Sequence, residues 1–250
     1  MRWRYRRTGR GPAVVLQHGF LCGPGYFEQL ADALSDRYDV IVPTLPGFAD
    51  HASRPALDSI ADFAEYLLGM LDHAGVNRFH LLGHSMGGMI AQEVALKSGA
   101  RVARLILFGT GPIGEMPGRF ESLEESRRRV EANGPENMIG RTVATWFMRG
   151  EEDPSFPDAL AVARTASLDA ILGGYRAMQD WRSLERLGEI RNPTLIVWGD
   201  GDRSYRRSQV DSLRRGIPDS RLAVMPGCSH NAHLENPKCF HDCVTDFLDG

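Results

Sequence analysis

Short apolar runs alternate along this chain with longer stretches in which apolar positions recur every three or four residues. The apolar runs are residues 13–17, 38–43, 79–83, 104–109, 193–199 and 221–227. Such near-continuous apolar character is typical of strands buried on both faces of a parallel sheet. Because helical patterns separate these strands, the chain is predicted to have an α/β fold, with a mainly parallel central sheet flanked by helices.

The stretches between the runs have the apolar spacing of amphipathic helices. They are residues 26–36, 59–75, 89–99, 208–217 and 239–248. At the N-terminus, Trp3 and Tyr5 alternate with arginines, which predicts an edge strand. The apolar run that follows is too short for a signal-peptide core, and no stretch reaches the ~18 apolar residues of a membrane span. We therefore expect no contact with a membrane.

Residues 111–190 interrupt this alternation. They contain no convincing strand, and they include a polar helical run at residues 121–133 (ESLEESRRRVEAN). Connections between a strand and a helix in α/β units are usually much shorter. We therefore predict an α/β core formed by residues 1–110 and 191–250, with residues 111–190 as a helical cap over the carboxyl edge of the sheet.

The segment GHSMGG (residues 83–88) places one serine among glycines where a predicted strand ends and a helix begins. Gly83, Ser85 and Gly87 fit the pattern G-x-S-x-G, which forms a sharp and strained strand-to-helix turn. Glycines give such a turn the room and the backbone freedom that it needs. A serine that only caps a helix would not need them. The pattern therefore predicts that Ser85 is a nucleophile, exposed at the positive end of a helix.

A serine hydroxyl needs a base, and the base needs an acid that orients it. His230 lies in the loop after the last predicted strand, and His233 is the alternative base, three residues further on. Asp200 and Asp202 both follow the preceding strand. We favour Asp202, because Asp200 comes so soon after the strand that we expect it to shape the turn. The catalytic residues would then occur in the order serine, aspartate, histidine, as in one particular α/β scaffold.

The remaining site residues are predicted from their places in loops and in the cap. Two backbone N–H groups must stabilise the developing oxyanion. Met86 directly follows the nucleophile, and Phe20 lies in the glycine-rich loop after the strand at residues 13–17. The predicted pocket residues are Leu21, Trp146, Phe147, Met178, Trp181 and His233. Three cap arginines would suit an acidic substrate, although no spacing distinguishes any of them: Arg149, Arg164 and Arg176.

Five segments, in order along nearly the whole chain, resemble the α/β-hydrolase fold family. They are HGF (18–20), LPGF (45–48), GHSMGG (83–88), PTLIVWGDGD (193–202) and GCSHNAHLENP (227–237). The resemblance implies a triad of Ser85, Asp202 and His230, an oxyanion hole formed by the amides of Phe20 and Met86, and neither a metal nor an organic cofactor. Within the family, the chain is similar to small esterases and lactonases of bacteria, including 3-oxoadipate enol-lactonase-type proteins.

These residues predict a cofactor-independent serine hydrolase that cleaves a small carboxylic ester or lactone through an acyl-enzyme. The same triad would serve a C–C bond hydrolase acting on a β-diketone or a dienoate, which is the alternative. His84 differs from the residue that enol-lactonases and C–C hydrolases often carry before the serine. Ser85 argues against haloalkane dehalogenases and epoxide hydrolases, which use an aspartate nucleophile. A non-catalytic receptor with a hydrolase fold is a third hypothesis.

Charge and cysteine content narrow the partners and the compartment. A formal net charge of −3 over 250 residues gives no broad attraction to nucleic acid, so we expect a small-molecule substrate as the partner. None of the four cysteines belongs to a CxxC pair. Free thiols are the usual state in a reducing compartment, which favours a cytoplasmic protein. The sequence leaves a homodimer open.

Overall fold

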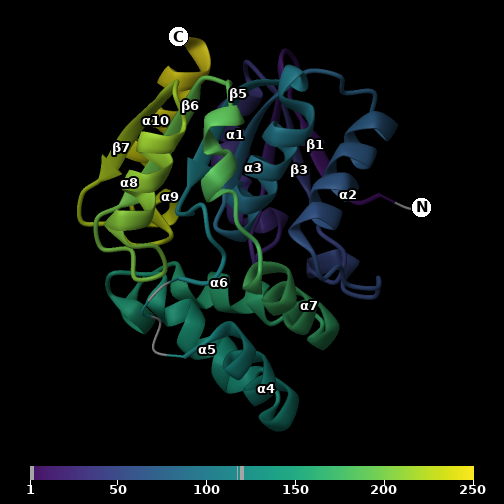
Figure 1. Cartoon of the computed structure of the whole chain (residues 1–250), viewed down its shortest axis with the longest axis vertical. Helices are drawn as coiled ribbons and strands as arrows, with labels where there is room; N and C mark the ends of the chain where they lie inside the picture. Colours follow the sequence, from purple (N-terminus) through teal and green to yellow (C-terminus); the bar gives the residue numbers. More distant parts are fainter. Residues whose placement is uncertain (1–2, 117, 119–120) are drawn as a thin grey trace.

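The computed structural model describes residues 3–116, 118 and 121–250, and it contains a seven-stranded sheet with the order β1-β3-β2-β4-β5-β6-β7 (Figure 1). The strands are β1 (Tyr5–Thr8), β2 (Ala13–Gln17), β3 (Asp39–Pro43), β4 (Phe79–His84), β5 (Val102–Phe108), β6 (Thr194–Gly199) and β7 (Ser220–Met225). Only β1 is antiparallel to its neighbour, and every other adjacent pair is parallel. The predicted α/β fold with a mainly parallel sheet is confirmed.

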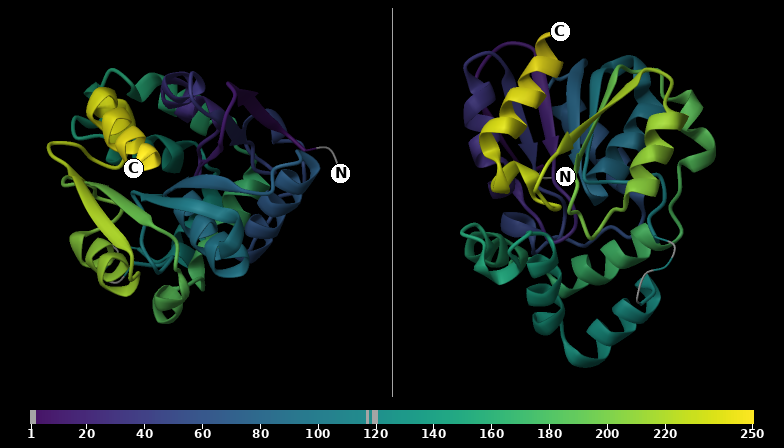
Figure 2. Two further views of the ribbon diagram at one scale, coloured as in Figure 1. Left: turned by 90° about the horizontal axis from the view of Figure 1, so that it is seen from above. Right: turned by 90° about the vertical axis from the view of Figure 1, so that its left-hand side faces the viewer.

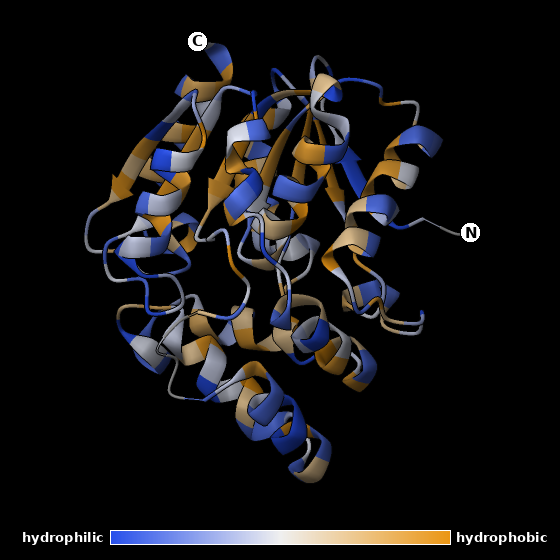
Figure 3. Ribbon diagram, viewed as in Figure 1, coloured by the Kyte–Doolittle hydropathy of each residue, from blue (hydrophilic) through white to orange (hydrophobic). Residues whose placement is uncertain are grey.

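Helices cover both faces of the sheet because successive side chains of each strand point to opposite faces. In β2, Val14 and Leu16 pack with one group of helices, and Val15 packs with the other. The first group is α1 (Glu28–Ser35) and α10 (Pro237–Asp249). The second is α2 (Ile60–His73), α3 (Met86–Ser98) and α8 (Arg207–Gly216). Figure 2 shows the two helical layers, and Figure 3 shows the mainly hydrophobic strands between them.

Four further helices lie together beyond one end of the sheet (Figures 1 and 2). They are α4 (Leu123–Asn133), α5 (Glu136–Thr145), α6 (Phe156–Ala163) and α7 (Leu168–Gln179). The chain leaves the carboxyl end of β5 to form them and returns to β6. The predicted polar run corresponds to α4, which begins at a capping box formed by Ser122 and Glu125. This α4–α7 segment is thus placed over the carboxyl ends of the strands.

Two glycines let α7 approach the core loops closely. A Cβ atom on Gly174 would lie 2.6 Å from the ring of Phe20, and one on Gly173 would lie 2.5 Å from the carbonyl oxygen of Leu57. Neither distance is compatible with a larger residue. The close packing places Tyr175 beside Phe20, with ring centroids 5.1 Å apart.

Short helices complete the chain between these elements. The four-residue α9 (Ala232–Glu235) precedes α10, and short 3-10 helices span Pro24–Phe27, Ala49–His51, Gly99–Arg101, Gly150–Glu152 and Leu184–Glu189. Among the helices of the described residues, none is both long enough and apolar enough to cross a bilayer.

Candidate active site

Ser85 occupies a strained turn between β4 and α3. Its φ of 57° and ψ of −122° lie outside the regions that a residue with a side chain usually adopts, and such a conformation costs about 1–3 kcal/mol. Hydrogen bonds of its backbone groups hold it, and two of them join it to the end of β5 and the residues that follow. The Ser85 N–H donates to the Phe108 carbonyl oxygen (2.9 Å), and the Thr110 hydroxyl donates to the Ser85 carbonyl oxygen (2.8 Å). Strain maintained in this way is a feature of functional sites.

The glycines around Ser85 are required by close approaches of the backbone. A Cβ atom on Gly83 would lie 2.2 Å from the Gly87 carbonyl oxygen, and one on Gly87 would lie 2.4 Å from the carbonyl oxygen of Gln17. On Gly88, a Cβ atom would lie 2.5 Å from the side chain of Thr110. The GHSMGG segment therefore has glycine wherever α3 starts too close to the neighbouring strand ends for a side chain.

His230 and Asp202 form a buried hydrogen-bonded pair. The His230 Nδ1 lies 2.9 Å from Asp202 Oδ2, and a carboxylate can only accept, so the proton is on Nδ1 and Nε2 is the free acceptor nitrogen. The other oxygen, Oδ1, accepts the backbone N–H groups of Ser204 (2.7 Å) and Tyr205 (3.1 Å). Asp202 is thereby fixed through both oxygens, and it fixes the tautomer of His230.

Asp200 lies outside this pair. Its side chain is exposed, and its Oδ1 accepts the N–H of Gly227 at 2.8 Å. That contact joins the turns that follow β6 and β7, which agrees with the role in shaping the turn that we expected for Asp200. Of the two aspartates that follow β6, only Asp202 contacts His230 in the structure.

One short turn separates Ser85 from His230. Ser85 bonds to both Phe108 and Thr110, and a Cβ atom on the intervening Gly109 would lie 3.1 Å from His230 Nδ1. Next to Ser85, His84 Nε2–H donates to the His230 carbonyl oxygen at 3.2 Å. Ser85 and His230 both lie in the described part of the chain, and no hydrogen bond joins the Ser85 hydroxyl to the His230 ring. In ligand-free enzymes such contacts are often long and shorten when substrate binds.

His18 fixes the loop that follows β2. Its Nε2 accepts the Leu45 N–H (3.1 Å), so its proton is on Nδ1, which donates to the Gly19 carbonyl oxygen (2.9 Å). Burial lowers the pKa of His18 to about 4. The ring is therefore neutral near pH 7, as both hydrogen bonds require.

This loop packs directly against the serine turn. A Cβ atom on Gly19 would lie 2.9 Å from the Ser85 Cβ and 3.2 Å from the Met86 nitrogen. Among the residues that the structure describes, no acceptor takes the N–H of Phe20 or of Met86. The two predicted oxyanion donors thus lie on adjacent backbone segments beside the serine. Within the described ranges, no group of three or more His, Cys, Asp or Glu side chains is arranged to hold a metal ion.

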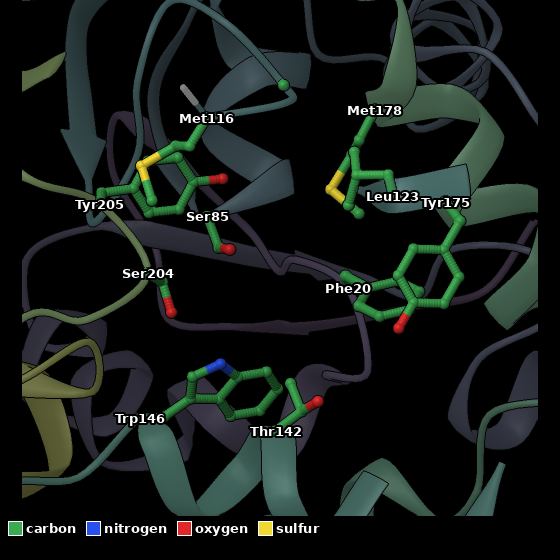
Figure 4. Close-up of a pocket in the computed structure, with 11 residues that line it drawn as sticks. Phe20, Ser85, Met116, Leu123, Thr142, Trp146, Tyr175, Met178, Ser204 and Tyr205 are labelled. Carbon is green, nitrogen blue, oxygen red and sulfur yellow. The ribbon is translucent and has the colours of Figure 1, made fainter. Parts of the chain in front are cut away.

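A small cavity of about 110 Å³ lies next to Ser85, between the strand ends and the α4–α7 segment (Figure 4). It is lined by Phe20, Ser85, Gly114, Met116, Leu123, Thr142, Trp146, Tyr175, Met178, Ser204 and Tyr205. Two of the predicted pocket residues, Trp146 and Met178, are among them. The described lining is aromatic, aliphatic, thioether and hydroxyl in character.

Four predicted pocket residues are not among the residues that line this cavity. Leu21 and Phe147 are fully buried in the hydrophobic core. Trp181 lies after α7 and donates its indole N–H to Glu93 (3.4 Å) on α3. His233 is buried among the rings of Tyr26, Phe27, His84, Phe108 and Phe240. Neither of the loops after β2 and β7 brings its predicted pocket residue, Leu21 or His233, to the cavity.

Sequence reasoning also missed part of the lining. Ser204 and Tyr205 come two and three residues after Asp202, the predicted triad acid, so they had to lie at the same sheet edge, and this proximity could have identified them. The Tyr205 ring is nearly parallel to that of His230, with an interplanar angle of 19° and centroids 5.7 Å apart. Thr142 and Tyr175 lie on α5 and α7. They carried no comparable signal, because helical periodicity does not show how two helices dock.

The buried histidines predict a loss of stability in acid. Burial lowers the pKa of His233 from 6.5 to about 3. Between these values the unfolded chain binds a proton that the folded chain does not, so the free energy of unfolding should decrease as the pH falls below 6.5. The slope is about 1.4 kcal/mol per pH unit for each such histidine. Urea unfolding at pH 7.0 and pH 5.0 measures it.

A variant pair isolates the part that His233 contributes. His233→Leu should reduce the decrease in unfolding free energy between pH 7 and pH 5 by about 2 kcal/mol. His73→Leu is the control, because His73 is exposed on α2. Equal acid dependence in both variants would contradict the assignment of this effect to burial of His233.

Comparison with known proteins agrees with this geometry. The family model described as alpha/beta hydrolase fold matches residues 12–237. The chain belongs to the α/β-hydrolase fold family. It is a hydrolase, and the predicted family is confirmed.

Similar proteins within the family differ in their reactions. The 2-hydroxy-6-oxo-6-phenylhexa-2,4-dienoate hydrolase of Burkholderia cepacia is 29% identical over 259 residues, which cover 96% of this chain and 89% of the relative. A thermophilic esterase from Thermogutta terrifontis is 27% identical, with a TM-score of 0.87 and coverage of 99% and 93% of the two chains. The enol-lactonase from Burkholderia xenovorans LB400 is 20% identical, with a TM-score of 0.89 and coverage of 99% and 96%, and it shows the shared fold. The bond that this hydrolase cleaves must therefore be argued from the site.

Proposed function

We propose that this hydrolase cleaves small, uncharged carboxylic esters or lactones through an acyl-enzyme on Ser85. The observation that carries the proposal is the buried hydrogen bond between His230 and Asp202, 2.9 Å long, beside the turn that presents the serine. It leaves Nε2 of His230 as an acceptor at the sheet edge where the half-buried Ser85 lies. An alcohol, an oriented imidazole and a buried carboxylate form the machinery of acyl transfer.

The steps follow from the protonation states. The Ser85 oxygen attacks the substrate carbonyl carbon while Nε2 of His230 takes the hydroxyl proton. The N–H groups of Phe20 and Met86 stabilise the oxyanion, and Asp202 stabilises the imidazolium. The intermediate then expels the alcohol, which receives the proton from His230. In the second half, His230 removes a proton from water, the hydroxide attacks the acyl carbon, and the acid leaves as Ser85 regains its proton.

The cavity supports a short and uncharged acyl group. At about 110 Å³ it is smaller than the engineered cavity of about 150 Å³ that holds benzene in another protein. The walls that Phe20, Trp146 and Tyr175 form are apolar. In this proposal, residues 111–190 act as the cap that shapes the acyl pocket.

C–C bond hydrolysis is the second candidate, and the Burkholderia cepacia relative favours it. The substrate in that relative's name is a dienoate and therefore carries a carboxylate. Of the three cap arginines considered for an acidic substrate, Arg149 and Arg164 are exposed, and Arg176 lies 3.8 Å from Glu131 on the surface. None of the three lines the cavity.

A substrate panel separates the two reactions. We expect kcat/KM for p-nitrophenyl butyrate or a five-membered lactone to exceed that for 2-hydroxy-6-oxo-6-phenylhexa-2,4-dienoate by at least about 100-fold. The reason is that the dienoate would have to bury its carboxylate without a partner. This raises the free energy of its transition state by about 3 kcal/mol or more. The measurement is initial-rate kinetics on the purified wild-type protein. The reverse order of the two values would favour the C–C hydrolase.

A fluorophosphonate probe tests the third hypothesis, the non-catalytic receptor. The probe reacts with serines that a base activates, so mass spectrometry of the labelled protein should locate the adduct on Ser85. An unlabelled Ser85, together with no turnover on the panel, would support a receptor instead.

A further inference from the structure

Ser204 is held rigidly beside the proposed triad acid. Its backbone N–H donates to Oδ1 of Asp202 at 2.7 Å, and the N–H of Tyr205 donates to the same oxygen at 3.1 Å. The carbonyl oxygen of Tyr205 in turn accepts the indole N–H of Trp198 at 2.8 Å. The backbone at residues 204–205 is therefore fixed by the carboxylate that orients His230 and by the end of β6.

The side chain of Ser204 lies in the substrate cavity. Figure 4 shows its hydroxyl among the lining residues, in the space that Ser85 and Trp146 also face. Among the described residues, no protein group forms a hydrogen bond with this hydroxyl, whereas the hydroxyl of Thr142 on the cavity wall donates to the Met138 sulfur at 3.4 Å. Ser204 thus offers one O–H donor and two acceptor lone pairs to a ligand.

We propose that Ser204 is a specificity-determining residue that hydrogen bonds a second, uncharged oxygen of the substrate. This inference rests on the proposed ester or lactone hydrolysis and deepens it. Because Ser204 and Ser85 line the same cavity of about 110 Å³, the oxygen that Ser204 binds is close to the reacting carbonyl. The substrate class is therefore an ester or lactone with a hydroxyl or keto group near its acyl carbon.

Uncharged recognition is consistent with the rest of the site. A small cavity with aromatic walls can bind a neutral hydroxyl of the substrate without a charged partner. In apolar pockets, a few well-placed polar groups commonly fix the orientation of a ligand. A ligand without the second oxygen that fills the cavity leaves the Ser204 hydroxyl unpaired. The resulting discrimination is about tenfold for a neutral hydrogen bond.

The test crosses one protein change with one substrate change. Wild-type protein and Ser204→Ala are assayed with p-nitrophenyl butyrate and with p-nitrophenyl 3-hydroxybutyrate. We expect Ser204→Ala to lower the ratio of kcat/KM for the hydroxy ester to kcat/KM for the butyrate by about tenfold. Ser204→Thr, which keeps a hydroxyl, should retain most of the preference. Thr142→Val is the matched control and should change kcat/KM for both esters by the same factor.

The outcomes distinguish a failure of the Ser204 role from a failure of the proposed ester or lactone hydrolysis. Equal losses on both esters would overturn the role in specificity, because they would mean that Ser204 only supports the aspartate loop. An unchanged preference in Ser204→Ala would overturn it as well. Wild-type protein that hydrolyses neither ester would overturn the proposed function itself, and the role of Ser204 with it.

Discussion

Replacing Ser85 with alanine is expected to lower kcat for ester hydrolysis by about 10⁴- to 10⁶-fold, because it removes the nucleophile and leaves only binding and the oxyanion donors. The measurement is kcat with p-nitrophenyl butyrate at saturating substrate. Ser208→Ala, at an exposed serine on α8, is the control and should be unaffected. Wild-type turnover in Ser85→Ala would contradict the acyl-enzyme mechanism.

The same variant separates chemistry from folding. The Ser85 hydroxyl has no hydrogen-bond partner among the described residues, whereas the turn is held through the backbone groups of Ser85, which an alanine keeps. Alanine also has the same Cβ atom in the strained conformation. The midpoint of thermal unfolding should therefore remain within about 2 °C of the wild-type value, since surface-like changes alter stability by about 0.5 kcal/mol or less.

The fold could be predicted because burial acts on each strand independently of the others. β2 spans Ala13–Gln17, as predicted, and it is apolar up to Gln17 because helices cover both of its sides. The predicted helix at residues 59–75 corresponds to α2 (Ile60–His73), whose start is fixed by the Ser59 side chain. Such signals are local, so they do not depend on how distant segments meet.

The serine turn was predictable for a steric reason. Its glycines follow from atoms that come within about 2.5 Å of any added Cβ, such as the carbonyl oxygen of Gln17 against Gly87. The choice of Asp202 over Asp200 followed from the distance of each residue from its strand. In both cases, chain geometry within a few residues carries the information.

The pocket depends on docking, which no local signal encodes. Trp146 and Phe147 are neighbours at the end of α5, yet Trp146 lines the cavity whereas Phe147 is fully buried in the core. Both side chains are large and aromatic. Their different surroundings come from the way in which the α4–α7 segment lies on the sheet, which involves Gly174 against Phe20, and helical periodicity does not contain that arrangement.

Replacing Asp202 with asparagine is expected to lower kcat by about 10⁴-fold. The control is Asp200→Asn, the same substitution two residues earlier. It should keep kcat within about twofold of the wild-type value, because an amide oxygen can still accept the Gly227 N–H. Initial rates with p-nitrophenyl butyrate measure both variants. If kcat fell as much in Asp200→Asn as in Asp202→Asn, the conformation of the loop, and not the contact between residue 202 and the imidazole, would determine kcat.

The size of this effect follows from the hydrogen bonds around residue 202. The N–H groups of Ser204 and Tyr205 both require an acceptor, so the oxygen of an asparagine takes the Oδ1 position and its NH₂ group faces His230. An amide NH₂ can only donate, so Nδ1 of His230 must become an acceptor and its proton moves to Nε2. A protonated Nε2 in the neutral ring cannot take the Ser85 proton. Asp202→Asn therefore keeps the geometry of the site but selects the tautomer of His230 that cannot act as a base.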